Sequence, residues 1–403
     1  MSRKSFTSSG KLPAPAAVPA QPHRDWSALH RSVAFGEARG QILWQPRLGP
    51  WYTERKFSGK ALPEPYEGKA VSDIYRALGC SERLYETFTP CFREIEPPEV
   101  HHLTTYLGDG RMQHSIVTPV GTQIEITRSM KNSWFVMHEK REIASEEDLR
   151  IATWREEHTT WAWEQDRYDN ALAEVGDLGA PTVTMPRMNV QELCINRMGR
   201  EHAVFAMHNW PKSVEAFFQA REDNHERLIA VINRSPIEII NFAENVHTTT
   251  LSPELFGKYH LPACRRRCDL LHAGGKFVSA HWDGACGPLL PFARQTGLDA
   301  LEAVTPAPQG DVSIEDIRRH LGEEMFLLDG IPAIFFDASC PVQTLVDFAR
   351  RVIELFAPRL ILGISDELSP TGEIERVKIV GEIVAEYNQR CAAAPPQRRA
   401  KKP

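Results

Sequence analysis

Eight short apolar runs recur along the chain, and most of them are followed by a segment with a helical pattern. They are mostly too short for helices, and too continuously apolar for a sheet that has one face in water. The pattern therefore predicts the strands of a parallel sheet that is buried on both faces. The runs are 40–46, 181–186, 203–208, 237–244, 276–283, 300–306, 325–330 and 359–366.

From residue 236 onward, strands and helices alternate regularly. Ser252, followed by Pro253, predicts the start of one helix, and the pair Gly274–Gly275 predicts its end. Ser313, with Asp316 three residues later, predicts the start of another. Repeated strand–helix units with eight strands predict an α/β protein with a closed (β/α)8 fold, the TIM barrel. Such a barrel needs about 250 residues, so about 100 remain for insertions.

The main insertion is expected between the first and second strands. Residues 114–129 alternate in polarity around a turn at Pro119–Gly121, which predicts a β-hairpin. A tryptophan-rich segment, 145–176, follows with a helical pattern. We interpret its aromatic side chains as core packing, although a ligand stack would use the same spacing.

Composition bounds the class of protein. With 42% hydrophobic and 25% charged residues, the chain is typical of a globular protein and not of a disordered, collagen-like or disulfide-stabilised one. The net charge of -6 argues against a dedicated nucleic-acid binder. No apolar run approaches the roughly 20 residues of a membrane helix, and the eight cysteines are scattered. We therefore expect a cytoplasmic protein with reduced thiols and neither nucleic-acid nor membrane partners.

The charge is distributed unevenly. Residues 1–24 and 392–403 contain four basic residues each and no acidic ones, so a body of charge -14 lies between two basic segments. We expect disordered tails at 1–26 and 389–403, because these segments bury too little apolar surface to fold, and one barrel domain at 27–388.

Polar residues close almost every predicted strand. Because catalysis in such barrels occurs at the carboxyl ends of the strands, we expect several of these residues to converge. Any one of them could instead cap the next helix. Buried acids need a positive partner, which would be Arg47 or a divalent cation. The possible metal ligands are His281, Asp283, Glu302 and Glu244.

Two segments carry a resemblance to a known family. Residues 251–306 (LSPELFGKYHLP through AHWDGACG to TGLDALEAVTP) and 360–377 (LILGISDELSPTGEIERV) resemble the core of the uroporphyrinogen decarboxylase superfamily, and TPVGT at 118–122 resembles its hairpin. The resemblance covers roughly 40–385 and implies the same barrel fold. The amino-terminal motif of the true decarboxylases, Arg-Gln-Ala-Gly-Arg, corresponds here to QPRLGPWYTER, in which only Arg47 is retained.

The other branch of the superfamily contains corrinoid-dependent methyltransferases, which bind zinc through a His-x-Cys pair and a later Cys. In this chain His281 matches the histidine, Asp283 replaces the first cysteine, and Ser365 or Asp366 replaces the second. An oxygen-rich site of this kind is similar to that of O-demethylase methyltransferases, for which Glu and His ligands are proposed. It would polarise a methyl donor rather than activate a thiol.

The resemblance implies a methyltransferase. Zinc or another divalent metal, held by His281, Glu302 and a further acid, would polarise a methoxyarene or methylamine. The methyl group would pass to a corrinoid carried by a partner protein, because the chain contains no Asp-x-His-x-x-Gly motif. A homodimer is compatible with this interpretation.

The remaining candidates complete this site. Arg47 and His208 would orient an anionic or phenolic substrate, and Asp329 and Asp366 would act as general acid or base. The predicted substrate-binding residues are Trp210, Asn245 and Trp282, although core packing explains the two tryptophans equally well. Two alternatives stay open, which are a metal-free decarboxylase-like lyase in which Arg47 anchors a carboxylate, and a barrel without catalysis.

Overall fold

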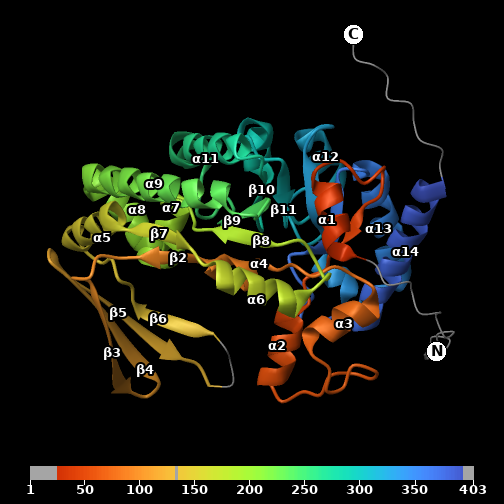
Figure 1. Ribbon diagram of the computed structural model, residues 1–403, viewed down its shortest axis with the longest axis horizontal. Coiled ribbons are helices and arrows are strands. Elements are labelled where there is room, and N and C mark those ends of the chain that lie inside the picture. Colours follow the sequence, from red (N-terminus) through yellow and green to blue (C-terminus); the bar gives the residue numbers. More distant parts are fainter. Residues whose placement is uncertain (1–24, 132–134, 394–403) are drawn as a thin grey trace, which may run out of the picture.

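The computed structural model describes residues 25–131 and 135–393. Its centre is a seven-stranded parallel sheet in the order β1-β13-β12-β11-β10-β9-β8, which curls like a TIM barrel (Figure 1). The strands are β1 (Leu43–Trp44), β8 (Thr182–Met185), β9 (Ile239–Val246), β10 (Phe277–Trp282), β11 (Ala300–Glu302), β12 (Phe326–Pro332) and β13 (Leu360–Ser365). Seven of the eight predicted strands are therefore confirmed.

The predicted strand at 203–208 is wrong. These residues lie in helix α8 (Arg200–Asn209), where Ala203 and Ala206 are buried while Val204 and Phe205 are exposed. Burial at every third residue is the pattern of a helix. In a run of only six residues, the sequence alone does not tell this pattern from that of a buried strand. The described residues consequently do not form a closed eight-stranded ring.

Strands β1 and β8, at the two edges of the sheet, are bridged by an irregular segment, Ser81–Thr89, which we call the closing segment. The backbone N–H of Ser81 donates to the carbonyl of Trp44 on β1 (2.9 Å). At its other end, the N–H of Thr184 on β8 donates to the hydroxyl of Thr89 (2.9 Å). Within the segment lies a short helix, α4 (Tyr85–Phe88). The segment thus takes the place of a strand without forming one.

Helices cover the outer face of the sheet (Figure 1). The caps at Ser252 and Ser313 are confirmed, because their side chains accept from the N–H groups of Leu255 (3.2 Å) and Asp316 (3.0 Å). The main covering helices are α9 (Pro211–Arg234), α11 (Leu261–Ala273), α12 (Ile314–Leu321), α13 (Val342–Phe356) and α14 (Ile374–Ala393). Shorter elements connect them, namely α2 (Gly49–Phe57), α3 (Val71–Leu78), α7 (Asn189–Gln191), α10 (Pro253–Leu255), η1 (Thr89–Cys91), η2 (Glu192–Arg197), η3 (Phe256–His260), η4 (Gly287–Gln295) and η5 (Ala333–Phe336).

Helix α1 (Trp26–Ala34) fills the amino-terminal end of the barrel. Its apolar residues, Trp26, Leu29 and Val33, pack in one buried cluster with the first inward-facing side chains of the strands, such as Phe277 and Phe326. This apolar plug leaves the carboxyl ends of the strands as the place for polar chemistry.

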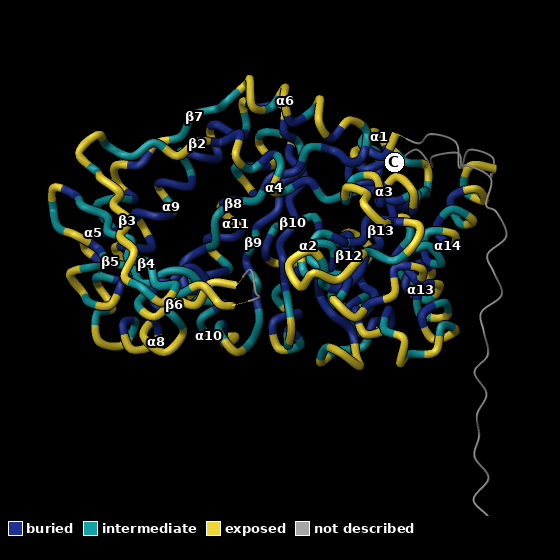
Figure 2. Tube along the Cα trace, turned by 90° about the horizontal axis from the view of Figure 1, so that it is seen from below, coloured by how far each residue is buried: buried dark blue, intermediate teal, exposed yellow. Residues whose placement is uncertain are grey.

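The insertion carries a second sheet. The predicted hairpin is confirmed as β4 (Arg111–Thr118) and β5 (Gly121–Ser129), which pair with β3 (His101–Gly108) and β6 (Val136–Lys140) in the antiparallel order β3-β4-β5-β6. Figure 2 shows β3 and β6 as largely exposed, in contrast to the buried central strands.

The predicted helical segment 145–176 forms α5 (Glu146–His158) and α6 (Gln165–Val175), but a strand separates them. That strand, β7 (Thr160–Trp163), has the sequence TWAW and pairs with β2 (Phe92–Ile95). Its β-branched and aromatic residues fit a pleated surface better than a helix.

The domain limits need one correction. Helix α1 begins at Trp26, next to the predicted limit. Helix α14 continues to Ala393, so residues 389–393 are helical although they were predicted to belong to the tail. The rest of both predicted tails lies outside the described residues. Of the described helices, none is both long and apolar enough to span a bilayer.

Candidate functional site

A buried charge cluster lies inside the barrel, formed by Arg83, Glu302 and Asp329. The Arg83 guanidinium donates to one oxygen of Glu302 and to both oxygens of Asp329, one of them at 3.2 Å. The three side chains are at most 4% exposed. Arg83 is therefore the positive partner that two buried carboxylates require.

Three uncharged side chains complete the cluster around Glu302. Tyr85 donates its hydroxyl proton to Glu302 at 3.1 Å, and the Asn241 amide donates to the same carboxylate oxygen. Asn241 also donates to Ser279 at 2.9 Å. Because burial raises the pKa of Tyr85 well above its usual range, the phenol stays protonated and remains a donor.

A more open group lies next to the buried cluster, at the carboxyl ends of the strands. Arg47 forms an ion pair with Asp366, and its second nitrogen is 3.8 Å from Glu367. His281 lies between two carboxylates, because its Nδ1 is 3.7 Å from Glu302 and its Nε2 is 3.7 Å from Asp366. We call Arg47, His281, Asp366 and Glu367 the rim group. The side chains of Arg47 and Asp366 are 27% exposed, so the rim group is in contact with solvent.

The charges set the protonation of both groups. Burial by itself lowers the pKa of His281, but the neighbouring carboxylates of Glu302 and Asp366 outweigh it and the pKa rises. Although burial favours the neutral acid, Arg83 and His281 hold the pKa of Glu302 below its usual range. For Asp329, burial and the charge of Glu302 outweigh Arg83 and raise the pKa to about 7. Since the two buried acids share one guanidinium, Asp329 takes up a proton more readily than Glu302 does.

Backbone geometry brings Asp329 into this cluster. Its φ of +81° lies in the left-handed region, which costs a non-glycine residue about 1–3 kcal/mol. Regular alternation would point Asp329 to the outer face, because Leu328 already packs in the inner cluster beneath it. The neighbouring Gly363 leaves the necessary space, since a Cβ there would lie 2.2 Å from Asp329 Oδ1.

The structure brings five of the predicted residues together, in the buried cluster and the rim group. These are Arg47, His281, Glu302, Asp329 and Asp366. Asp283 lies nearby, and its charge contributes to raising the pKa of Glu367 after the larger effect of burial.

Two predicted catalytic and metal-binding residues lie elsewhere. His208 is exposed on α8, because the strand that was to position it is a helix. Glu244 is three residues from the inward-facing Asn241 and therefore points to the outer face of β9. There both of its oxygens accept from the N–H of Met188 (3.0 and 3.1 Å), and burial raises its pKa to about 7.

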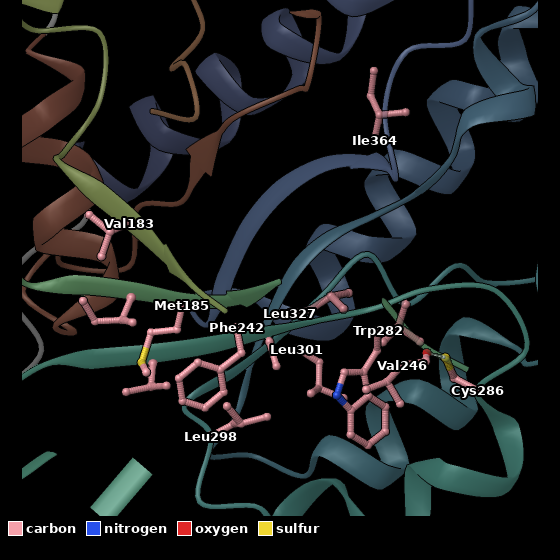
Figure 3. Close-up of a cluster of buried hydrophobic side chains, with 14 of the residues drawn as sticks. Val183, Met185, Phe242, Val246, Trp282, Cys286, Leu298, Leu301, Leu327 and Ile364 are labelled. Carbon is pink, nitrogen blue, oxygen red and sulfur yellow. Dashed lines mark hydrogen bonds between the residues drawn. The ribbon is translucent and has the colours of Figure 1, made fainter. Parts of the chain in front are cut away.

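The predicted substrate-binding residues also lie apart from the rim group. Trp282 follows the inward-facing His281 and so faces outward, where it packs edge-on against Phe256 in the buried apolar layer of Figure 3. Trp210 lies at the junction of α8 and α9 and packs against the core. Asn245 accepts a hydrogen bond from Arg187 at 2.6 Å.

The predicted metal site does not fit this arrangement. Of its four predicted ligands, His281 and Glu302 are neighbours at 3.7 Å, whereas Glu244 lies on the outer face of β9. Within residues 25–131 and 135–393, no three His, Cys, Asp or Glu side chains are arranged to hold a metal ion. Two guanidinium groups, of Arg83 and Arg47, already bind the carboxylates that a cation would need.

Sequence reasoning missed Arg83, Tyr85 and Asn241. Asn241 gave a signal, because it interrupts the apolar run 237–244 at a position that faces the same side as Ile239. Arg83 and Tyr85 gave none, since the closing segment follows neither a helical nor a strand period.

Comparisons with known proteins relate the fold to solved structures. No family model and no curated protein matches the sequence. A methyltransferase from Methanosarcina mazei superposes with a TM-score of 0.53 over 88% of this chain and 97% of its own, at 12% identity. A D-psicose 3-epimerase solved with D-fructose (61% of this chain, 88% of its own, 9% identity) reaches only 0.35. The D-psicose 3-epimerase from Clostridium cellulolyticum H10 (58% and 86%, 9% identity) reaches 0.34.

At 12% identity the likeness to the methyltransferase concerns the fold alone, and it supports a TIM-barrel-like fold for this chain. Membership of the uroporphyrinogen decarboxylase superfamily stays a prediction.

Proposed function

We propose that this chain is a methyltransferase that takes a methyl group from a small methylated substrate of the methoxyarene type. The observation that carries the proposal is the position of His281, which lies between Glu302 and Asp366 at the open end of the barrel. Both carboxylates favour the imidazolium form, so a proton donor is available at the site. The likeness of the fold to a methyltransferase supports the same reaction class.

In this reaction His281 gives its proton to the ether oxygen while the bond between that oxygen and the methyl carbon breaks. Both electrons of the bond stay on the oxygen, the methyl group passes to a nucleophilic acceptor, and a phenol leaves. His281 thus stabilises the negative charge on the leaving oxygen, a role that a metal ion would otherwise take. Asp366 lies 3.7 Å from Nε2 and is 27% exposed, so it can return a proton from solvent to the ring.

The predicted acceptor is the reduced corrinoid of a separate protein, which supplies a strong nucleophile for methyl groups. Arg47 remains the predicted contact of this chain for a phenolate or carboxylate on the substrate. Because Arg47 already pairs with Asp366 and is near Glu367, a substrate anion would have to share it.

The variant His281→Gln tests the proposal. With cob(I)alamin as acceptor and 4-methoxybenzoate as donor, we expect phenol formation to fall about 10²–10⁴-fold, the usual contribution of a general acid. In the wild type, the rate should fall as pH rises, because the unprotonated ring has no proton to give. The matched control is His208→Gln on the surface of α8, which should keep the wild-type rate. A His281→Gln variant as active as wild type would contradict the proposal.

A second candidate is the metal-free carboxy-lyase, because Arg83 and Arg47 occupy the carboxylates that a metal would need. Here a carbon–carbon bond breaks, CO2 leaves, and the carbon that keeps the electron pair takes the proton of His281. An assay of CO2 release from carboxylated substrates without corrinoid separates the two reactions. Release of CO2 without demethylation would show that the chain is a lyase and not a methyltransferase. If neither product forms, the result favours a barrel without catalysis.

A further inference from the structure

A cavity of about 300 Å³ lies between the edge strand β8 and the inserted segments. Its wall combines the end of β8 with η2, α5, α9 and the small sheet of β2 and β7. Element η2 is a π-helix, a form that often occurs at functional sites. The volume is at the lower end of the range of small-molecule sites, about 300–1,000 Å³, so the cavity suits a small ligand.

The cavity borders the buried charge cluster. Thr184 of β8 and Ala243 of β9 line it from the inner face of the barrel. Thr184 pairs in register with Asn241, whose side chain donates to Glu302. A ligand in the cavity would therefore lie beside the cluster and not on a remote surface.

Three arginines line the cavity, and two of them are neutralised. Arg221 pairs with Glu156 (2.6 Å) and Glu192 (3.2 Å). Arg197 pairs with Glu192 (2.5 Å) and lies 3.7 Å from Glu156. These two arginines and two acids form a network of ion pairs in the wall of the cavity, in which their charges cancel.

Arg187 is different, because its charge has no carboxylate partner within 4.0 Å in the described part of the chain. Its two terminal nitrogens donate to amide oxygens, to Asn245 at 2.6 Å and to Asn196 at 3.4 Å. Its Nε is buried and has no hydrogen-bond partner among the described residues. The covered Nε cannot reach a ligand, but each terminal nitrogen keeps a second N–H. A guanidinium that is oriented by neutral groups can therefore receive an anion at these two nitrogens, and a carboxylate fits their fork geometry.

We propose that this cavity binds a small monocarboxylate of about the size of benzoate, with its carboxylate on Arg187. Trp161 supplies apolar surface to the cavity and is held by a hydrogen bond from its Nε1 to Asn224 (2.8 Å). The ligand thus meets a cation without an ion-pair partner together with the apolar surface of Trp161. The third acid of the wall, Glu94, has a pKa that burial raises, which favours its neutral form. The site is distinct from Arg47, and the inference concerns binding alone, so it holds whichever reaction occurs at His281.

Isothermal titration with benzoate, and with neutral benzamide for comparison, tests the site. Benzoate should bind the wild type more tightly than benzamide. In Arg187→Met the benzoate affinity should fall about tenfold or more, the effect of one charge-assisted hydrogen bond, while Arg187→Lys should retain part of it. The matched control is Arg150→Met, which removes an exposed arginine that pairs with Glu147 and should leave binding unchanged.

Thermal melts show whether each variant is folded, and benzoate should raise the melting temperature of the wild type more than that of Arg187→Met. His281→Gln should bind benzoate normally even when it has lost activity, which separates this site from the proposed chemistry. Equal benzoate affinity of wild type and Arg187→Met, or no preference for benzoate over benzamide, would overturn the proposal.

Discussion

Gly363 decides whether the buried charge cluster can form. A Cβ at this position would meet Asp329 Oδ1 at 2.2 Å, Arg83 Nη2 at 3.0 Å and the carbonyl oxygen of Gln45 at 3.0 Å. Since this pocket is close-packed and charged, none of the three neighbours can move without losing a contact.

We therefore expect Gly363→Ala to lower the free energy of unfolding by about 1–3 kcal/mol, as overpacking does, and to reduce activity as well. Chemical denaturation measures the first effect. Gly49→Ala is the control, because Gly49 begins α2 and a Cβ there meets nothing within 4 Å. If the two variants were equally stable, the close approach at Gly363 would not matter.

Glu244 makes the stability depend on pH. Burial raises its pKa to about 7, whereas an exposed glutamate titrates near about 4.3. Between these values the folded protein holds a proton that the unfolded chain has released, so this group makes folding less favourable as pH rises. Glu244→Gln removes that effect, and from pH 5 to pH 8 the variant should gain up to about 3 kcal/mol relative to wild type.

Denaturation curves of both proteins at the two pH values give this difference directly. Glu324→Gln serves as the control, because that side chain is 86% exposed, and its difference from wild type should not change with pH. A Glu244→Gln variant whose difference from wild type is also constant would show that Glu244 is ionised in the folded protein throughout.

Part of the site could be predicted residue by residue. His281 and Asp366 were found because they stand at the ends of recognisable apolar runs, and Glu302 because it interrupts the run 300–306; the carboxyl ends of parallel strands meet at one edge. Glu244 and Trp282 were misplaced because a strand end alone does not tell which face a side chain takes. Alternation from Asn241 and His281 would have placed both on the outer face.

At the scale of elements, the barrel strands were predictable and the element at 203–208 was not. The strands from β9 to β13 follow clear turn and cap signals, and their apolar runs are long enough to be recognised. Helix α8 contains a short run, AVFAMH, with alanine at the buried positions and valine and phenylalanine at the surface. Because Val204 and Phe205 are apolar although exposed, the run is continuously apolar like a buried strand, and the helical period of its buried positions is hidden.

The closing segment is the weakest part of the ring. Strands β10 and β12 have a hydrogen-bonded strand on each side, whereas β8 pairs with a strand on one side only. Few backbone hydrogen bonds join the closing segment to its neighbours, and local opening is easiest where such bonds are few. Amide hydrogens of the closing segment and of β8 should thus exchange faster than those of β10 and β12.

Hydrogen–deuterium exchange measured by mass spectrometry checks this expectation on the unmodified protein. Peptides from α9 provide the comparison for a helix of the outer layer. Equal protection of β8 and β10 would mean that the closing segment acts like a full strand.

At the scale of the whole molecule, the sequence indicated one barrel with an insertion, and the structure has that arrangement with an incomplete ring. The small β2–β7 sheet was missed because the pairing of distant short segments leaves no local signal. The cavity beside Arg187 was missed for the same reason, since its wall combines residues from Thr89 to Ala243 that only the fold brings together.

The apolar plug of α1 closes the amino-terminal end of the barrel. Trp26, Leu29 and Val33 lie at that end, whereas Arg47, His281 and Asp366 lie at the opposite end, where the strands have their carboxyl termini. A small substrate and a large partner protein would both approach the rim group at this end of the barrel. If both bind there, as the proposed function requires, the small molecule has to bind before the large partner covers the site.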